Sequence, residues 1–214
     1  NMKKTMAFFA AAVLLVFLPL PVTGQGSVDG EKLLSEAAAA IKKEKSYKAT
    51  FTYLMPGEAV SRNGVLYVSG DKYRLTMDFL DRIYDGRRTY NIMPDEKEVG
   101  IEESSSATAG NSLGSISDIL NTFARDFTVL SGERKGTVQY LRLTPKNTRS
   151  ATEYVLVGID TATKMLVDVT EKSRSAGSTY LKVTGIDREY KTEAAMFSFD
   201  RGKYKKEGYY IAEP

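Results

Sequence analysis

Acidic side chains are the first candidates for chemistry, because the sequence contains no His and no Cys. Two groups of carboxylates lie close together along the chain: Asp95, Glu96 and Glu98 form one, and Glu102 and Glu103 form the other. A pair of carboxylates can serve as general acid and general base. Both groups fall where the pattern predicts a turn and a loop of mixed charge, so a solvated surface explains them better.

The missing residue types exclude several classes of enzyme. Without His or Cys, the chain has no Ser-His-Asp triad, no His/Cys zinc site, no His/Cys ligation of haem or iron–sulfur clusters, and no disulfide. A Gly-x-Ser-x-Gly nucleophile elbow would lack its base, and no phosphate-binding glycine loop or dinucleotide fingerprint occurs. A hydrolase that uses carboxylates or Ser and Lys remains an alternative. We expect no enzyme activity, no metal and no cofactor.

Charge and the N-terminus indicate an exported protein. The chain has 30 Lys and Arg against 27 Asp and Glu, a net charge of +3, which is too small and too evenly spread for nucleic-acid binding. Lys3 and Lys4 precede an apolar run over 6–20, and small residues follow, a pattern typical of a secretory signal peptide. The run is too short for a membrane span, which needs about 20 residues. We predict cleavage after Gly24, which leaves 25–214 as a single domain.

The elements that would position a site are mainly strands. Helical spacing of apolar residues predicts helices over 28–45 and 115–127. Residues 102–114 are expected to form a loop, 131–136 a turn and 202–214 a tail. Alternation of apolar and polar residues predicts strands at 49–55, 65–68, 73–79, 82–84, 89–93, 98–101, 127–130, 138–143, 153–159, 165–170 and 179–186. The sequence therefore predicts a mainly β, α+β fold, with one antiparallel sheet of ten or eleven strands and two to three helices.

More apolar sheet is predicted than these helices can cover. A curled sheet of this kind leaves a concave apolar site that suits an acyl chain or lipid, although for any single residue an ordinary core position is the simpler interpretation. The expected lining residues are Phe51, Tyr53, Leu66, Val68, Tyr73, Leu75, Met77 and Phe79 from the strands and Ile116, Ile119, Leu120 and Phe123 from the second helix.

The order of features resembles one known family, the LolA-type periplasmic carriers of outer-membrane lipoproteins in Gram-negative bacteria. The resemblance covers most of the chain after the signal peptide, and it includes the Asp85-Gly86 turn between two strands. The matching segments are 46–52, 64–68, 72–75, 83–90, 141–145 and 197–199. This resemblance implies an unclosed antiparallel β-barrel with two to three helices as a lid over a hydrophobic cavity.

The family's function is implied in the same way. Such a carrier would be a periplasmic monomer that takes acylated lipoproteins from an inner-membrane ABC-type exporter and delivers them to an outer-membrane receptor. Similar half-barrels serve as envelope-stress sensors or glycolipid-binding proteins, and these stay open as alternatives. The apolar segment before the cleavage site is a further candidate occupant of a lipid groove.

The sequence departs from the family at two features. The Arg that latches the lid in some members corresponds to Gly70 here, so Lys72 or Arg74 would have to replace it. Positions often filled by Trp hold other residues, among them Tyr67 and Tyr90. We therefore expect a divergent member whose cavity is lined by Tyr, Phe, Leu and Met.

Overall fold

A computed structural model of the chain describes residues 28–103 and 115–212. The predicted signal peptide, and the idea that its apolar segment fills a groove, lie outside these residues. The elements in chain order are α1 (Gly30–Lys42), β1 (Ser46–Leu54), β2 (Arg62–Ser69), β3 (Lys72–Met77), β4 (Leu80–Tyr84), β5 (Arg88–Met93), β6 (Glu98–Glu103), α2 (Ile116–Asp126), β7 (Phe127–Lys135), β8 (Val138–Pro145), β9 (Thr152–Asp160), β10 (Leu166–Ser173), β11 (Ser178–Asp187), a 3₁₀ turn η1 (Ala194–Phe197), α3 (Arg201–Lys206) and β12 (Tyr210–Ala212).

The strands in the described residues belong to one sheet, in the order β12-β6-β5-β4-β3-β2-β1-β11-β10-β9-β8-β7. Neighbours from β2 to β6 and from β7 to β11 pair antiparallel, and β12 pairs parallel to β6. The sheet has two ends and is open. The predicted mainly β fold with an unclosed antiparallel sheet is therefore confirmed, with β12 as the strand that the sequence did not predict.

The contacts divide the chain into two compact units that interleave along the sequence. Within the described residues, unit 1 comprises 28–41, 53–61 and 120–182, and unit 2 comprises 42–52, 62–103, 115–119 and 183–212. The prediction of a single domain over 25–214 stays a prediction.

In unit 1, α1 packs against the strands through a glycine. The predicted apolar stripe of α1, which includes Leu33, Leu34 and Ile41, is buried. A Cβ atom added at Gly30 would lie 2.7 Å from Val129 Cγ1 and 3.1 Å from Leu141 Cδ2. Since Gly30 has no side chain, the start of α1 can approach β7 and β8 this closely. We call the face that carries Val129 and Leu141 the α1 face of unit 1.

The second helix begins where the sequence predicts. The Ser115 hydroxyl accepts a hydrogen bond from the backbone N–H of Asp118 at 3.3 Å, and the Asp118 carboxylate accepts one from the N–H of Ser115 at 3.1 Å. This reciprocal pair satisfies donors at the helix start that have no partner within the helix. Ser115 is therefore the N-cap of α2.

Three predicted boundaries are wrong. β3 ends at Met77, and Asp78 and Phe79 form the turn to β4, so Phe79 is not a strand residue. β7 continues to Lys135 in place of the turn predicted at 131–136, because the chain reverses tightly at Gly136, whose φ of +59° suits glycine. β6 includes Glu102 and Glu103, which the sequence assigned to the following loop.

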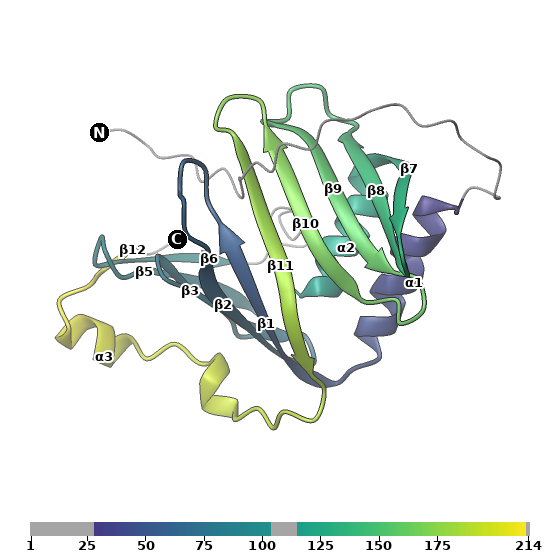
Figure 1. The fold of residues 1–214 in the computed structure, drawn as a ribbon. Coiled ribbons are helices and arrows are strands. Elements are labelled where there is room, and N and C mark those ends of the chain that lie inside the picture. Colours follow the sequence, from purple (N-terminus) through teal and green to yellow (C-terminus); the bar gives the residue numbers. More distant parts are fainter. Residues whose placement is uncertain (1–27, 104–114, 213–214) are drawn as a thin grey trace. The chain divides into compact units, whose positions relative to one another are not determined.

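The predicted tail folds onto unit 2. The side chains of Phe199, Tyr204, Tyr209 and Ile211 pack on a buried cluster of β4, β5 and β6 that contains Ile83, Tyr90, Ile92, Val99 and Ile101. Rings of Tyr90 and Phe199 stack at 4.7 Å, and those of Phe199 and Tyr204 at 5.2 Å. Figure 1 shows this segment, in yellow, running from β11 through α3 to β12. The C-terminal residues are therefore part of the fold.

Candidate ligand-binding site

The predicted lining residues of unit 2 share one face of the sheet. Leu66 pairs with Leu75 and Val68 pairs with Tyr73 across β2 and β3. Directly paired residues of antiparallel strands point to the same side, and Met77 follows Leu75 in the alternation. We call the face that carries these side chains the candidate face.

Phe51 of β1 joins this face through Gly64. Gly64 lies two residues before Leu66, so it belongs to the candidate face. A Cβ atom added at Gly64 would approach two ring carbons of Phe51 more closely than 3.0 Å. The Phe51 ring therefore lies directly over the Gly64 backbone.

The first turn of α2 lies close to the same face. Tyr47 precedes Phe51 in the β1 alternation and is 1% exposed. Burial raises the pKa of the Tyr47 hydroxyl well above its ordinary value, and the nearby backbone N–H of Ile116 partly opposes this rise. The start of α2 is therefore placed over the candidate face at β1.

The predicted lining residues differ in how exposed their side chains are and in which of the two units they belong to. Phe51, Tyr53, Leu66, Val68, Tyr73, Met77, Ile116 and Leu120 are buried. The four others, Leu75, Phe79, Ile119 and Phe123, are half-buried. Tyr53, Leu120 and Phe123 belong to unit 1, and the remaining nine belong to unit 2. The structure thus brings together the residues of β1, β2 and β3, and contact of any of the twelve with a ligand stays a prediction.

A buried polar chain that the sequence reasoning missed continues the candidate face. Arg82 pairs with Leu75 across the sheet, and its Nε donates to Asn91 Oδ1 at 2.6 Å. Asn91 Nδ2 in turn donates to Glu102 Oε1 at 3.1 Å. Arg82 and Asn91 are each 8% exposed. The candidate face is therefore apolar on β2 and β3 and includes this polar chain on β4 to β6.

Glu102 and Glu103, the possible acid–base pair at the end of β6, have side chains on opposite faces of the sheet. Glu102 bonds Asn91 on the candidate face, whereas Glu103 forms an ion pair with Arg88 at 2.6 Å. Successive residues of a strand point to opposite faces, and Arg88 shares its face with Tyr90. The two carboxylates therefore cannot act on one substrate atom. In residues 28–103 and 115–212, no group of three His, Cys, Asp or Glu could hold a metal ion.

The residues suggested for a lid latch have other partners. Arg74 lies on the opposite face from Tyr73 and forms a two-point ion pair with Asp81, at 2.6 and 2.9 Å. Its Nη1 also donates to the carbonyl of Met196 at 3.4 Å. The Lys72 side chain lies near Gly86 in the turn between β4 and β5. These contacts connect Arg74 to the C-terminal segment, and a latch role for Lys72 or Arg74 stays a prediction.

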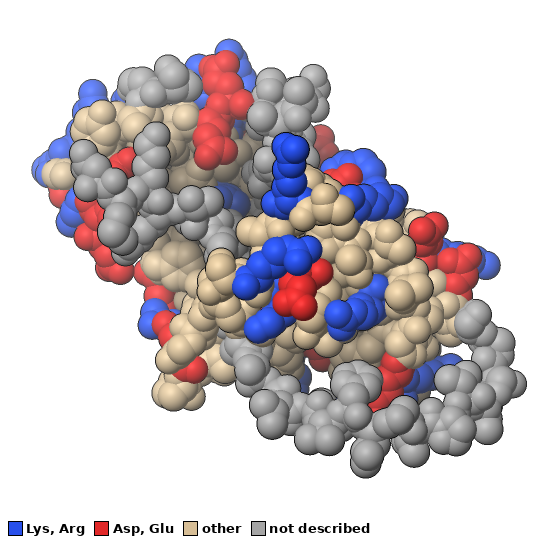
Figure 2. All heavy atoms as spheres, turned by 90° about the horizontal axis from the view of Figure 1, so that it is seen from above, with Lys and Arg blue, Asp and Glu red and all other residues tan. Residues whose placement is uncertain are grey.

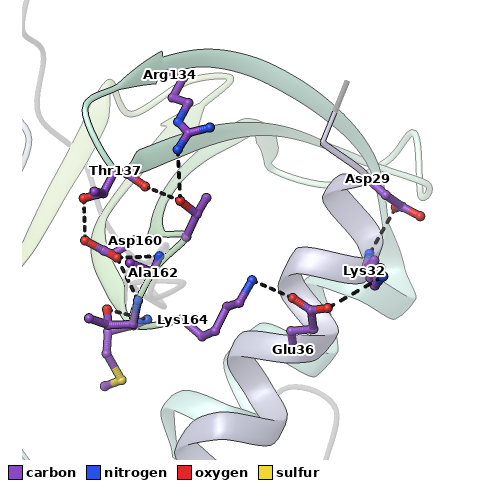
Figure 3. Close-up of polar contacts among 11 residues, drawn as sticks. Asp29, Lys32, Glu36, Arg134, Thr137, Asp160, Ala162 and Lys164 are labelled. Carbon is purple, nitrogen blue, oxygen red and sulfur yellow. Dashed lines mark hydrogen bonds and ion pairs between the residues drawn. The ribbon is translucent and has the colours of Figure 1, made fainter. Parts of the chain in front are cut away.

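An ion pair ties α1 to the strands of unit 1. Figure 3 shows Glu36 of α1 pointing toward Lys164, in the turn between β9 and β10, and their charged atoms lie 2.7 Å apart. The hydrogen bond from Lys164 lowers the pKa of the Glu36 carboxyl. Asp160 holds the turn, because its carboxylate accepts from Thr137 Oγ1 at 2.7 Å and from the N–H of Ala162 at 2.8 Å. Both members of the ion pair are more than one third exposed, so the pair contributes little to stability.

A second polar group lies on the α1 face of unit 1. Val155 of β9 pairs with Glu171 of β10, and Glu171 pairs with Thr179 of β11. The Thr152 hydroxyl donates to Glu171 Oε1. Thr179 is fully buried, and its hydroxyl has no hydrogen-bond partner among the described residues. Sequence reasoning missed both residues, because Glu171 follows the strand predicted at 165–170 and a polar residue within an alternating strand, such as Thr179, is normally assigned to the solvent side.

Replacing Glu171 by Gln should change how stability depends on pH. Burial raises the pKa of the Glu171 carboxyl above 4.5, and the bond from Thr152 partly opposes this. A pKa raised by folding gives stability that is complete below the unfolded value and is lost as pH rises through the folded one. Wild type should therefore lose stability relative to Glu171→Gln between about pH 4 and about pH 7. Thermal unfolding at both pH values measures this, with the exposed Glu153→Gln as control; an equal difference at both pH values would contradict it.

Charged side chains of both signs are mixed on the surface. Figure 2 shows Lys and Arg interspersed with Asp and Glu on the face in view. That the protein does not bind nucleic acid stays a prediction. None of the helices in the described residues is long and apolar enough to cross a membrane.

Several solved structures are similar to this chain. An uncharacterized conserved protein from Thermus thermophilus is 12% identical, with a TM-score of 0.52 over 78% of this chain and 93% of that one. A LolA superfamily protein from Nitrosomonas europaea is also 12% identical, with a TM-score of 0.40 over 81% and 99%. The Pseudomonas aeruginosa MucA/MucB complex matches at 12% identity and a TM-score of 0.40, over 80% and 62%.

These similarities concern the fold. A LolA superfamily protein is among the similar structures, as the resemblance in the sequence predicts. No protein-family model matches the sequence, and no curated protein matches it either. The chain therefore shares its fold with the Thermus thermophilus protein, and its function has to be inferred from its own residues.

Proposed function

We propose that this protein is a carrier, not an enzyme, that binds the acyl chains of lipoproteins and transfers them between the two membranes of a bacterial envelope. The observation that supports this is the continuous apolar candidate face formed by Phe51, Leu66, Val68, Tyr73 and Met77 in an open antiparallel sheet. Apolar side chains with few polar groups are what an acyl chain requires.

In this proposal the protein works as a monomer in the periplasm, after export by its N-terminal segment. It would receive acylated lipoproteins from an inner-membrane ABC-type exporter and pass them to an outer-membrane receptor. Burial of an acyl chain is favourable by about 0.8 kcal/mol per CH₂, so loading needs no covalent chemistry. Release then requires a second apolar cavity that competes for the same chains.

Leu75→Glu should strongly weaken loading and leave the fold intact. Leu75 is half-buried on the candidate face, so a carboxylate there can remain hydrated in the empty protein but would be desolvated by a bound acyl chain. We expect at least about a tenfold loss of lipoprotein extraction from spheroplasts. Tyr73→Glu is a poorer probe, because Tyr73 is only 4% exposed and the buried charge would unfold the protein.

Val65→Glu is the matched control. Val65 is also half-buried and pairs with Thr76 on the opposite face of the same two strands. It should load normally, while circular dichroism checks that both variants fold. Normal loading by Leu75→Glu would mean that the candidate face does not hold the ligand. If wild type extracts no lipoprotein, the carrier proposal fails, and a sensor that binds a protein partner without moving lipoproteins becomes the better interpretation.

A further inference from the structure

One row of side chains on the α1 face of unit 1 changes from apolar to polar. Val129 of β7 pairs with Leu143 of β8, and Leu143 pairs with Val155 of β9. The same row continues through Glu171 of β10 to Thr179 of β11. Since paired residues point to one side, a carboxylate and a hydroxyl terminate a row of three aliphatic side chains.

Both polar groups are unfavourable for the free energy of folding in the protein without a ligand. Thr179 is fully buried, and its hydroxyl lacks a hydrogen-bond partner within the described part of the chain. An unpaired buried hydroxyl is unfavourable for folding, and Val would fill the same space without that cost. Glu171 has Thr152 as its hydrogen-bond donor, and desolvation raises the pKa of its carboxyl. A carboxylate and a hydroxyl of this kind, side by side, are expected where a ligand supplies the hydrogen bonds that the protein does not.

The two groups differ in what they can accept and donate. The Glu171 carboxylate accepts hydrogen bonds, whereas the unpaired Thr179 hydroxyl can donate one. Directly paired residues in a sheet have Cβ atoms about 5 Å apart, so one small planar group can reach both. A secondary amide carries an N–H donor beside a C=O acceptor and therefore matches this pair.

We propose that Glu171 and Thr179 bind the amide of an N-acyl group. The amide N–H donates to the Glu171 carboxylate, and the amide carbonyl accepts from the Thr179 hydroxyl. This site rests on the proposed function, and it adds a selectivity: acyl amides should bind better than acyl esters, and free fatty acids should bind worst because their carboxylate faces Glu171.

The test compares three probes of equal chain length on the full-length protein by calorimetry: N-methylpalmitamide, methyl palmitate and palmitate. Wild type should bind the amide at least about tenfold more tightly than the ester. Glu171→Leu should bring that ratio close to one, because it removes the acceptor for the amide N–H. Thr179→Val should weaken the amide and the ester alike, because both use the carbonyl, and Glu171→Gln should improve binding of palmitate.

The controls are Glu153→Gln, on an exposed position of β9, and Thr170→Val, on the opposite face of β10. Both should retain the wild-type preference. Equal affinity of wild type for amide and ester would overturn this inference alone, as would an unchanged ratio in Glu171→Leu. Failure of all three probes to bind would instead overturn the proposed function, and this site with it.

Discussion

Tyr204→Ala should destabilise the protein by about 3 kcal/mol, the usual cost of removing a large buried side chain. Tyr204 is 8% exposed and packs between Phe199 and Tyr209, with ring centroids 5.2 and 5.0 Å away. It also belongs to the buried cluster that contains Ile83 and Tyr90. The truncation removes the ring that joins the C-terminal segment to the sheet, so urea unfolding should show a lower midpoint.

Tyr210→Ala is the control for this prediction. Tyr210 lies in the same segment but is 69% exposed, so its loss should cost less than about 0.5 kcal/mol. If the two variants unfold at the same urea concentration, the C-terminal segment does not pack on the sheet as described. Arg74→Ala should fall between them, because it leaves Asp81 without its ion-pair partner and frees the carbonyl of Met196.

The docking of this segment could not be predicted from the sequence. Residues 202–214 are rich in Tyr and Lys and lack a regular apolar period, so they are typical of a polar tail. Their packing depends on a parallel pairing of β12 with β6, from which β12 is separated by more than a hundred residues. Local patterns carry no information on such a partner. The result covers the face of β3 to β6 that lies opposite the candidate face.

The candidate face itself could be predicted, because it depends on local alternation. The face residues keep a period of two within β2 and again within β3, and such a pattern fixes which side chains share a face. Phe79 breaks this rule. The strand ends at Met77, and Leu80 takes the next position on the candidate face as the partner of Met77.

The face on which Glu171 lies could not be predicted from the alternation of β10. A β-bulge between Leu166 and Asp168 shifts the alternation of β10 by one residue. After the bulge, Val169 and Glu171 point to the α1 face, while Asp168 and Thr170 point away. An uninterrupted alternation from Leu166 would have placed Glu171 on the opposite face of β10, which carries Asp168. The position of Glu171 on the α1 face therefore follows from one extra residue in the strand.

Gly64→Ala should destabilise the protein by about 1–3 kcal/mol, the usual cost of overpacking a core position. The new Cβ would lie closer than 3.0 Å to two ring carbons of Phe51, a separation that forces the ring to move. Phe51 is 6% exposed on the candidate face, so its displacement should also lower acyl binding. Thermal unfolding and lipoprotein loading measure the two effects.

The controls separate a clash from a general effect of replacing glycine in a strand. Gly100 of β6 has no described atom within 4 Å of an added Cβ, so Gly100→Ala should be neutral or stabilise the protein by about 0.5 kcal/mol. Adding Phe51→Leu to Gly64→Ala should recover part of the lost stability, because a smaller side chain leaves room for the methyl group. Equal effects of the two glycine replacements, or no recovery in the double variant, would show that Phe51 does not pack over Gly64. The candidate face would then lack the ring that connects β1 to β2.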